Sequence, residues 1–373
     1  MNSNSKGDIF AACVTVHDYS QAFSRQCHKL GVMSFINNGV RPSLIPLLVN
    51  YFQGRRCKIK WRGHISSEKL LPGSGAQGSA LGNWEYLSQT NNNADHIPAS
   101  DRWKWVDDLT TLEIVNLITI GLSSYNFRQH VASDIPEHGQ FVNPDNLLTQ
   151  NYIHTLDNWS DLHLMKLNEK KTKILLFNFT KKYQFATRLT LKGSNIEQVN
   201  EAKILRTIVS DSLSWDANTK RIVKKCHMRM QLLRQVARFG ADPLIMKQIY
   251  IQIIRVILEG SCQVWDGGLT VRNRRDLERI QKLCMWIILP NHTYKEVLRK
   301  LDLEDLQTRR TKLTLRFAKL HNIDGKLGSL FKHNEKIHTM KTRNSFKYIS
   351  TANTNRFQKS PILHMQQLLN SLK

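Results

Sequence analysis

The chain has 373 residues, which is long enough for two or three domains with a sizeable core. Its 54 lysines and arginines against 30 aspartates and glutamates give a formal net charge of +24, a balance that favours a polyanionic partner. No stretch is long and apolar enough to span a bilayer, and the short apolar run at residues 9–16 lacks the basic leader of a signal peptide. We therefore expect no membrane association and a location in the nucleus or the cytoplasm.

The six cysteines indicate neither a disulfide framework nor a zinc site. None of them forms a Cys-x-x-Cys pair, the usual spacing of zinc ligands and of redox motifs. The set Cys13, His17, Cys27 and His28 also fits no common zinc motif. We expect unpaired thiols in a reducing compartment.

Two short strand patterns in the first third of the chain contain aspartates. Residues 14–18 are rich in β-branched side chains and end in Asp18. Residues 103–111 hold the tryptophan, valine, leucine and threonine that favour a half-buried strand, interrupted by Asp107 and Asp108. Adjacent carboxylates are costly to bury without a compensating cation. Either a solvent-exposed turn or a turn that directs both acids toward a metal ion resolves this conflict.

The segments around these strands predict a helix and two loops. Residues 42–52 contain four side chains at helical spacing: Leu44, Leu47, Leu48 and Tyr51. Residues 72–82 are rich in glycine, which permits positive φ and close backbone approach but equally suits a flexible surface loop. Residues 133–151, with two prolines and many polar side chains, predict a loop or an insertion.

From about residue 215 to residue 325 the pattern becomes helical. Asp242 and Pro243 are typical of the start of a helix, here one that runs to Glu259. Residues 298–320 form another amphipathic, basic segment, and an earlier helix is indicated by the apolar repeat Leu277, Ile280, Cys284 and Ile287. Beyond Asn322 there is little periodicity until residues 362–372, so we expect a loosely ordered tail.

One helical segment, residues 220–238, carries seven basic residues and no acidic one. Its apolar residues recur at helical spacing: Ile222, Cys226, Met230 and Leu233. The pattern predicts a helix whose basic face is either simply solvated or binds nucleic-acid phosphates, with binding that falls steeply as salt rises. The candidate phosphate-binding residues are Lys220, Arg221, Lys224 and Lys225.

Four segments resemble, in the right order, the motifs of a reverse transcriptase. Residues 18–23, Asp-Tyr-Ser-Gln-Ala-Phe, are similar to the family's Asp-(Phe/Leu)-Ser-Lys-Ala-Phe, and residues 75–82 resemble its Gly-x-Pro-Gln-Gly-Ser-x-Leu-Gly loop. Residues 106–108 stand where the family has (Ala/Val)-Asp-Asp, and residues 167–173 match Leu-Asn-x-x-Lys-Thr-Lys. Segments near Trp215 and Trp265 also resemble the family's region after the palm. The chain most resembles the RNA-directed DNA polymerase of a jockey-like, non-LTR retrotransposon.

The resemblance implies an α+β fold: a reverse-transcriptase palm, with helices packed on an antiparallel sheet, then an α-helical thumb and a C-terminal helical region. It implies a palm with residual fingers at residues 1–210, a helical thumb or connection at 211–325 and a basic, partly disordered tail at 326–373. Only 17 residues precede Asp18, so most of the fingers are missing and we expect an N-terminally truncated copy. Neither an endonuclease nor an RNase H site is recognisable in the sequence.

The resemblance also implies a site for nucleotidyl transfer. Asp18 and Asp107 would bridge two Mg²⁺ (or Mn²⁺) ions, with Asp108 assisting, and such paired ions lie about 3.5–4 Å apart. Magnesium prefers oxygen ligands and often takes one or two carboxylates plus substrate phosphates. The implied partners are an RNA template, a DNA primer and a dNTP.

The turn of the fourth motif contains Lys170, Lys171 and Lys173. One of them would supply a cation near the leaving pyrophosphate and could serve as general acid, and Lys171 fits the motif best. The alternative is a solvated lysine-rich turn.

Four further residues are implied to bind the nucleotide. The backbone at Tyr19 would approach the triphosphate, and the ring of Phe23 would crowd a ribose 2′-hydroxyl, although Phe23 is otherwise an ordinary core residue. Gln77, followed by Gly78, would contact the incoming nucleotide and the template.

The chain departs from the family pattern at Ser24, at Ala76, where proline usually precedes the glutamine, and at Arg206, where a glycine belongs to the hairpin that grips the primer. Two functions stay open. The intact aspartate triad favours an active polymerase. The missing fingers, Ala76 and Arg206 favour a catalytically inactive remnant that at most binds nucleic acid.

Overall fold

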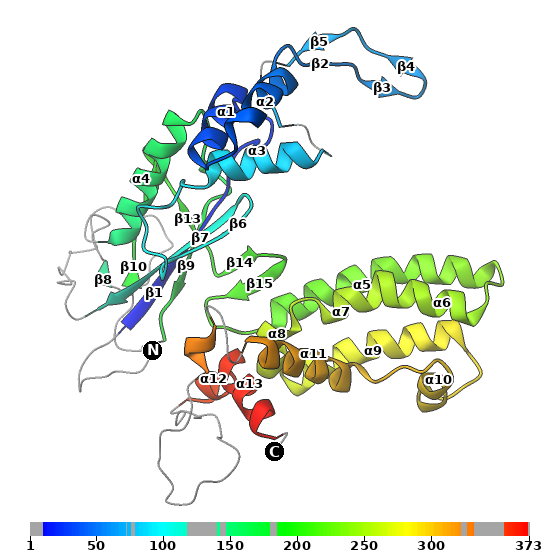
Figure 1. Cartoon of the computed structure of the whole chain (residues 1–373). Helices are drawn as coiled ribbons and strands as arrows, with labels where there is room; N and C mark the ends of the chain where they lie inside the picture. The colour runs from blue at the N-terminus through cyan, green and yellow to red at the C-terminus, as the bar shows by residue number, and fades with distance from the viewer. Residues whose placement is uncertain are drawn as a thin grey trace, which may run out of the picture. The chain divides into compact units, whose positions relative to one another are not determined.

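A computed structural model describes residues 10–71, 73–75, 79–117, 140–141, 147–179, 185–321, 327–331 and 354–371 (Figure 1). The chain forms two compact units, Met1–Leu205 and Arg206–Lys373. The expected division at residues 210 and 325 stays a prediction. Ala76, Gln77 and Gly78 lie outside the described residues, as does most of the segment 133–151.

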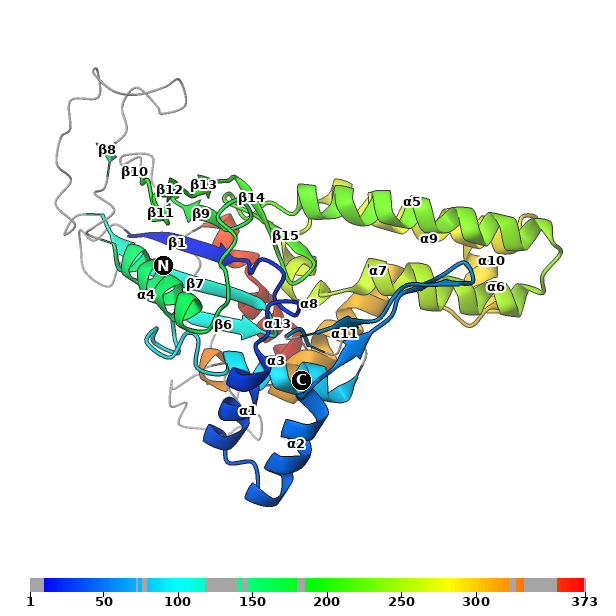
Figure 2. The same cartoon turned by 90° about the horizontal axis from the view of Figure 1, so that it is seen from above.

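A five-stranded sheet forms the centre of the first unit, in the order β13-β9-β1-β7-β6. Strand β1 (Phe10–His17) lies between β7 (Asp108–Asn116) and β9 (Lys173–Phe177) and is antiparallel to both. Strand β6 (Arg102–Trp105) forms a hairpin with β7, and β13 (Glu197–Gln198) pairs in parallel with β9. Figure 2 shows β1, β7 and β6 side by side. The strands expected on both sides of the Asp107–Asp108 pair and before Asp18 are confirmed.

The described helices of the first unit are α1 (His28–Asn37), α2 (Ile45–Phe52), α3 (Ala80–Thr90) and α4 (Leu148–Leu162). Helices α3 and α4 share the buried cluster of the sheet, whereas α1 and α2 form a separate cluster around Phe35, Leu48 and Phe52. Small residues Ala11 and Cys13 of β1 belong to the same buried cluster as Ile153 and Leu156 of α4. Each fully buried aliphatic side chain of this kind stabilises the fold by roughly 1.5–3 kcal/mol.

The expectation for α2 needs correction. The helix expected at residues 42–52 exists, as a 3₁₀ turn (Pro42–Leu44) followed by α2, but its buried residues are Leu48 and Phe52. Leu44 and Leu47 are 42% and 64% exposed, because α2 packs against α1 through a narrower stripe than the sequence suggests.

The loop expected at residues 133–151 was wrong at its end, where α4 begins. The carboxylate of Glu113, on β7, accepts hydrogen bonds from the backbone N–H groups of Leu148 (3.0 Å) and Thr149 (2.8 Å). A residue distant in sequence thus satisfies the free N–H groups of the helix start, which local start signals do not reveal.

Short strands complete the first unit. Strand β2 (Arg56–Cys57) pairs with β5 (Lys69–Leu70), and β3 (Lys60–Trp61) pairs with β4 (His64–Ile65). The remaining short strands are β8 (Gln140–Phe141), β10 (Phe185–Ala186), β11 (Thr190–Leu191), β12 (Ser194–Asn195) and β14 (Glu201–Ile204).

The described residues of the second unit are helical apart from strand β15 (Thr207–Ser210). Its longest described helix is α5 (Asp216–Arg238), whose expected apolar residues Ile222, Cys226, Met230 and Leu233 are all buried. It packs against α9 (Val271–Ile288), where Leu277, Ile280 and Cys284 of the second predicted repeat are buried and Ile287 is partly buried (Figure 2).

The helix expected from Asp242 to Glu259 is confirmed, with one addition. Asp242 caps α6 (Pro243–Ile249) by accepting a hydrogen bond from Leu244 N at 2.7 Å. The chain then passes through a π-helical segment (Tyr250–Arg255) into α7 (Val256–Glu259).

Residues 298–320 form parts of two helices, not a single one: α10 (Tyr294–Lys300) and α11 (Leu306–His321). Asp302 lies between them at φ +47°. The unit also contains α8 (Cys262–Trp265), α12 (Asn355–Gln358) and α13 (Pro361–Asn370).

The α+β class is confirmed, since an antiparallel-rich sheet with packed helices precedes a helical unit. Within the described part of the chain, no helix has the length and apolar character needed to cross a membrane.

Candidate active site

Three strands bring the predicted acidic residues to one edge of the sheet. Asp18 follows the last residue of β1, and the register places His17 opposite Leu109, near the start of β7. On the other side of β1, Val16 lies opposite Lys173, the first residue of β9. Because both neighbours are antiparallel to β1, the end of β1 meets the beginnings of β7 and β9. Asp18, Asp107, Asp108 and the lysine turn therefore converge, although they are far apart in sequence.

The Asp107–Asp108 pair sits at a tight hairpin turn. Trp105 pairs with Asp108, which leaves Val106 and Asp107 as the two turn residues. Val106 has φ +57°, a conformation in which a β-branched residue is strained. Such strain persists only where the surroundings enforce it, and it concentrates at functional sites. The turn thus holds two exposed carboxylates in a defined place at the edge of the sheet.

The three carboxylates act on one another electrostatically. Partial burial raises the pKa of Asp108, and repulsion from Asp107 and then from Asp18 raises it further. Lys203, on β14, opposes this shift. A negatively charged cluster of this kind favours a cation or a proton near Asp108.

Lys171 is the lysine of the fourth motif that reaches the acidic cluster. Its Nζ lies 3.6 Å from Oδ2 of Asp18, an oxygen that is buried and accepts no hydrogen bond from the described residues. Lys173 instead pairs with Glu197, and Lys170 makes no ion pair with the described residues. Of the three lysines, Lys171 is therefore the one whose ion pair joins the acidic cluster, and its role stays a prediction.

Backbone hydrogen bonds fix this turn to the segment after Asp18. Asn168 N donates to the carbonyl of Asp18 at 2.8 Å, and Ser20 N donates to the carbonyl of Lys166 at 2.8 Å. The side-chain oxygen of Asn168 accepts a hydrogen bond from Lys171 N at 3.2 Å. Asn168 is thus a positioning residue for Lys171, a role that its place in the motif alone did not suggest.

The carboxylates of Asp18, Asp107 and Asp108 could supply some, but not all, of the ligands of a hard divalent cation. Among the described residues, no three His, Cys, Asp or Glu side chains come close enough to hold a metal ion by themselves. Magnesium often uses one or two protein carboxylates and completes its shell with substrate phosphates and water. The Oδ2 of Asp18 accepts no hydrogen bond from the described residues and lies 3.6 Å from Lys171 Nζ. This oxygen and the mutually repelling carboxylates of Asp107 and Asp108 are compatible with that mode.

Tyr19 and Phe23 occupy different environments. The side chain of Tyr19 is buried in the core, where its hydroxyl accepts a hydrogen bond from Asn93 Nδ2 at 3.2 Å and burial raises its pKa. Only the backbone of Tyr19 is therefore left to contact a nucleotide. The ring of Phe23 is partly buried and packs 4.6 Å from the ring of Tyr86, centroid to centroid.

The glycine-rich loop begins against the segment that follows Phe23. Gly75 N donates to the carbonyl of Phe23 at 2.8 Å, and Ser74 N donates to the carbonyl of Gln26 at 2.9 Å. A Cβ on Gly73 would lie 2.6 Å from that same carbonyl oxygen, so only glycine permits the approach. The positions of Gln77 and Gly78 fall outside the described residues.

Three buried polar side chains of the first unit were missed in the sequence: Tyr86 and His17 near the aspartates, and Glu85 against Gly31 of α1. Burial raises the pKa of Tyr86, and the charges of Tyr19 and the three aspartates raise it further. Glu85 is fully buried, with a pKa raised by burial to about 7, although Arg55 opposes the shift. Burial lowers the pKa of His17 to about 3, and its Nε2 lies 3.0 Å from Thr111 Oγ1. No periodic pattern marks these residues, because they lie on separate elements.

In the second unit, the basic face of α5 is exposed as expected. Lys220, Lys224 and Lys225 are exposed, whereas Arg221 is half-buried and donates to Asn218 Oδ1 at 3.1 Å. Three of the four candidate phosphate-binding residues are thus accessible, and the fourth is partly engaged within the unit.

Comparison with known proteins identifies no family for the chain. No model of a protein family matches the chain, and no curated protein matches it. One similar solved structure is that of apo telomerase from Candida tropicalis, with 12% sequence identity and a TM-score of 0.38. The match covers 83% of this chain and 45% of the telomerase chain, so the chain spans less than half of that protein's length.

Proposed function

We propose that the chain is an RNA-directed DNA polymerase that transfers a nucleotide from a dNTP to the 3′-hydroxyl of a primer. The observation that carries this proposal is the convergence of Asp18, Asp107 and Asp108 at one edge of an antiparallel sheet, with Lys171 beside them. The order of the four sequence motifs supports assignment to a non-LTR retrotransposon of the jockey-like kind.

In this proposal each residue of the site has a separate role. Asp18 and Asp107, with help from Asp108, would hold Mg²⁺ or Mn²⁺, which when bound would activate the primer hydroxyl and neutralise phosphate charge. Lys171 would place a positive charge, or a proton, at the departing pyrophosphate. Phe23 would border the sugar of the nucleotide, and the backbone at Tyr19 would face its phosphates. The first unit would then correspond to a palm and the helical unit to a thumb.

A second candidate is a non-catalytic remnant that binds nucleic acid. Glu85 favours it, because a buried carboxyl group without a hydrogen-bond partner among the described residues destabilises the first unit. The side chain of Arg206 at φ +69°, a conformation that suits glycine, favours it as well.

Primer extension distinguishes these candidates. The full chain is incubated with a DNA primer on an RNA template, dNTPs and Mg²⁺ or Mn²⁺. We expect wild type to incorporate nucleotides and Asp107→Asn to lose at least about a thousand-fold in rate, since the transition-state charge loses its counter-ion. Asp161→Asn, which removes an exposed carboxylate of α4, is the matched control and should keep the wild-type rate.

Template–primer binding is measured on the same proteins. If neither wild type nor Asp107→Asn incorporates nucleotide while both bind template–primer equally, the polymerase proposal fails and the remnant stands. If wild type and Asp107→Asn extend primers equally, the assignment of the site itself is wrong.

A further inference from the structure

A basic β-ribbon, residues 55–71 and called the arm below, projects from the first unit. It consists of the pairs β2–β5 and β3–β4, and Figure 1 shows it extending away from α1, α2 and α3. Every residue of β3, β4 and β5 is exposed. The arm is thus not held by a hydrophobic core, and its side chains are available to a partner.

The charge of the arm is one-sided, with cations along its whole length. It contains six lysines and arginines and a single acid, Glu68. Glu68 pairs with Arg56 at 3.1 Å and with Lys58 at 3.3 Å. The exposed cations that have no carboxylate partner among the described residues are Lys60, Arg62 and Lys69.

The tip presents an aromatic ring, that of Trp61, which stands between Lys60 and Arg62 in the sequence. Trp61 pairs with His64 across a two-residue turn, in which Arg62 and Gly63 have φ +46° and +87°. Positive φ at both positions is typical of the tight turns that match the twist of a hairpin. Trp61 is 71% exposed, and the guanidinium carbon of Arg62 lies 5.8 Å from the centre of its ring.

Because paired residues of a hairpin share a face, Trp61 and His64 lie on one face and Lys60 and Ile65 on the other. The exposed indole offers a surface for a nucleobase. Arg62 at the turn, Lys60 on the other face and Lys69 nearer the foot offer charge to the sugar–phosphate backbone along the ribbon. Proteins that bind single strands without reading sequence combine these two features.

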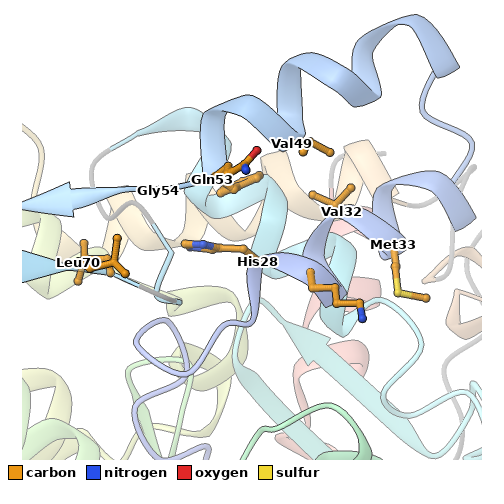
Figure 3. Close-up of a pocket in the computed structure, with 10 residues that line it drawn as sticks. His28, Val32, Met33, Val49, Gln53, Gly54 and Leu70 are labelled. Atoms are coloured by element: carbon orange, nitrogen blue, oxygen red, sulfur yellow. The ribbon is translucent and has the colours of Figure 1, made fainter.

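The foot of the arm has a different chemistry. A hollow of about 440 Å³ opens there, lined by apolar side chains such as Val32, Val49, Phe52 and Leu70 (Figure 3). His28 packs at a tilt against Phe52 with ring centroids 5.0 Å apart, and Lys29 and Gln53 also line the hollow. The mostly apolar walls differ from the exposed, cation-rich ribbon beyond the hollow, which is the surface considered for binding.

We infer that the arm binds single-stranded nucleic acid, with a base stacked on Trp61 and phosphates against Lys60, Arg62 and Lys69. The arm is a binding surface separate from the aspartate site, and its action requires no polymerisation. An anionic membrane surface is the competing partner for a basic ribbon with exposed apolar residues, but the aromatic ring flanked by cations and the extended shape favour a single strand.

The test measures binding of the full chain to a labelled oligouridine by fluorescence anisotropy over a range of salt concentrations. We expect Trp61→Ala to weaken binding about ten-fold because the stacked base loses its platform. The double variant Lys60→Ala/Arg62→Ala should flatten the dependence of log K on log salt by about 0.7 for each phosphate that is no longer neutralised. Trp84→Ala, at another tryptophan with 64% exposure, and Lys29→Ala/Arg41→Ala are the matched controls and should leave binding unchanged.

Three outcomes would overturn the inference. The first is an unchanged affinity in both arm variants. The second is that Trp61→Ala weakens binding to duplex RNA as much as binding to the oligouridine, because a base within a duplex offers no face for stacking. The third is a loss of binding to phosphatidylserine vesicles with binding to the oligouridine retained. Primer extension is scored separately, so an inactive protein with arm-dependent binding refutes the proposed polymerase function and supports the arm.

Discussion

The two units treat their charged residues in opposite ways. In the first unit, Asp18, Asp107 and Asp108 raise one another's electrostatic energy at the edge of the sheet, and Glu85 is buried without a hydrogen bond to the described residues. In the second unit, the buried Asp266 accepts a hydrogen bond from Nε of the fully buried Arg310 at 2.7 Å. Like charges kept together cost stability, and folds retain them where a ligand compensates. The first unit thus keeps a cluster of like charges at the candidate site, whereas the second unit pairs a buried carboxylate with a buried guanidinium.

The largest effect on stability is expected from the paired charges of the second unit. Asp266→Asn removes the partner of a buried guanidinium and should lower the free energy of unfolding by about 3–5 kcal/mol. Glu304→Gln, which breaks the exposed pair with Lys312, is the control and should cost less than about 1 kcal/mol. Urea unfolding of the full chain measures both. Equal small losses would remove the contrast between the units.

Glu85 provides a pH-dependent test in the first unit. Its pKa is about 7 in the folded chain against the ordinary 4.5, so the folded state holds the proton more tightly. The free energy of unfolding should therefore fall as pH rises from about 4.5 to about 7, by about 3 kcal/mol. Glu85→Gln should abolish this part of the pH dependence, and the exposed Glu201→Gln should leave it intact. A wild-type stability that is flat across this range would show that Glu85 is not destabilising.

The exposed lysines of α5 allow a test of whether the second unit binds nucleic acid. Charge reversal in Lys224→Glu/Lys225→Glu should weaken nucleic-acid binding about ten-fold or more and flatten its salt dependence, because fewer phosphates are neutralised. Stability should change little, since both side chains are exposed. Lys295→Glu/Lys319→Glu reverses two exposed charges of the same unit on other helices as a control. Unchanged binding in the α5 variant would contradict a phosphate-binding role for this helix.

The smallest effect is expected at Arg206. Its φ of +69° is unfavourable for a residue with a Cβ, so Arg206→Gly should raise the free energy of unfolding by about 1 kcal/mol. Arg229→Gly, at an exposed position inside α5, should instead lower it by about 1 kcal/mol. Thermal unfolding of both variants shows whether each substitution raises or lowers the free energy of unfolding. A decrease at both positions would show that the Arg206 side chain stabilises the fold by more than its backbone strain costs.

Much of the fold follows from local patterns. The apolar repeat Ile222, Cys226, Met230 and Leu233 predicts α5 because a helix places these side chains on one stripe, and Asp242 predicts the start of α6 because it caps free N–H groups. The start of α4 was missed, since its cap is Glu113 on a distant strand. The break between α10 and α11 was missed because the apolar residues continue across it.

The sequence by itself determined which residues belong to the candidate site, because Asp18, the Asp107–Asp108 pair and the lysine turn stand in a recognisable order. Only the tertiary structure decided where they lie. The antiparallel register of β1 with β7 and β9 brings the three segments to one edge, the fourth-motif turn places Lys171 Nζ 3.6 Å from Asp18, and packing turns the side chain of Tyr19 into the core. The pairing of β1 with β7 and β9 joins segments that are far apart in the sequence, and the local pattern of each segment does not name its partner.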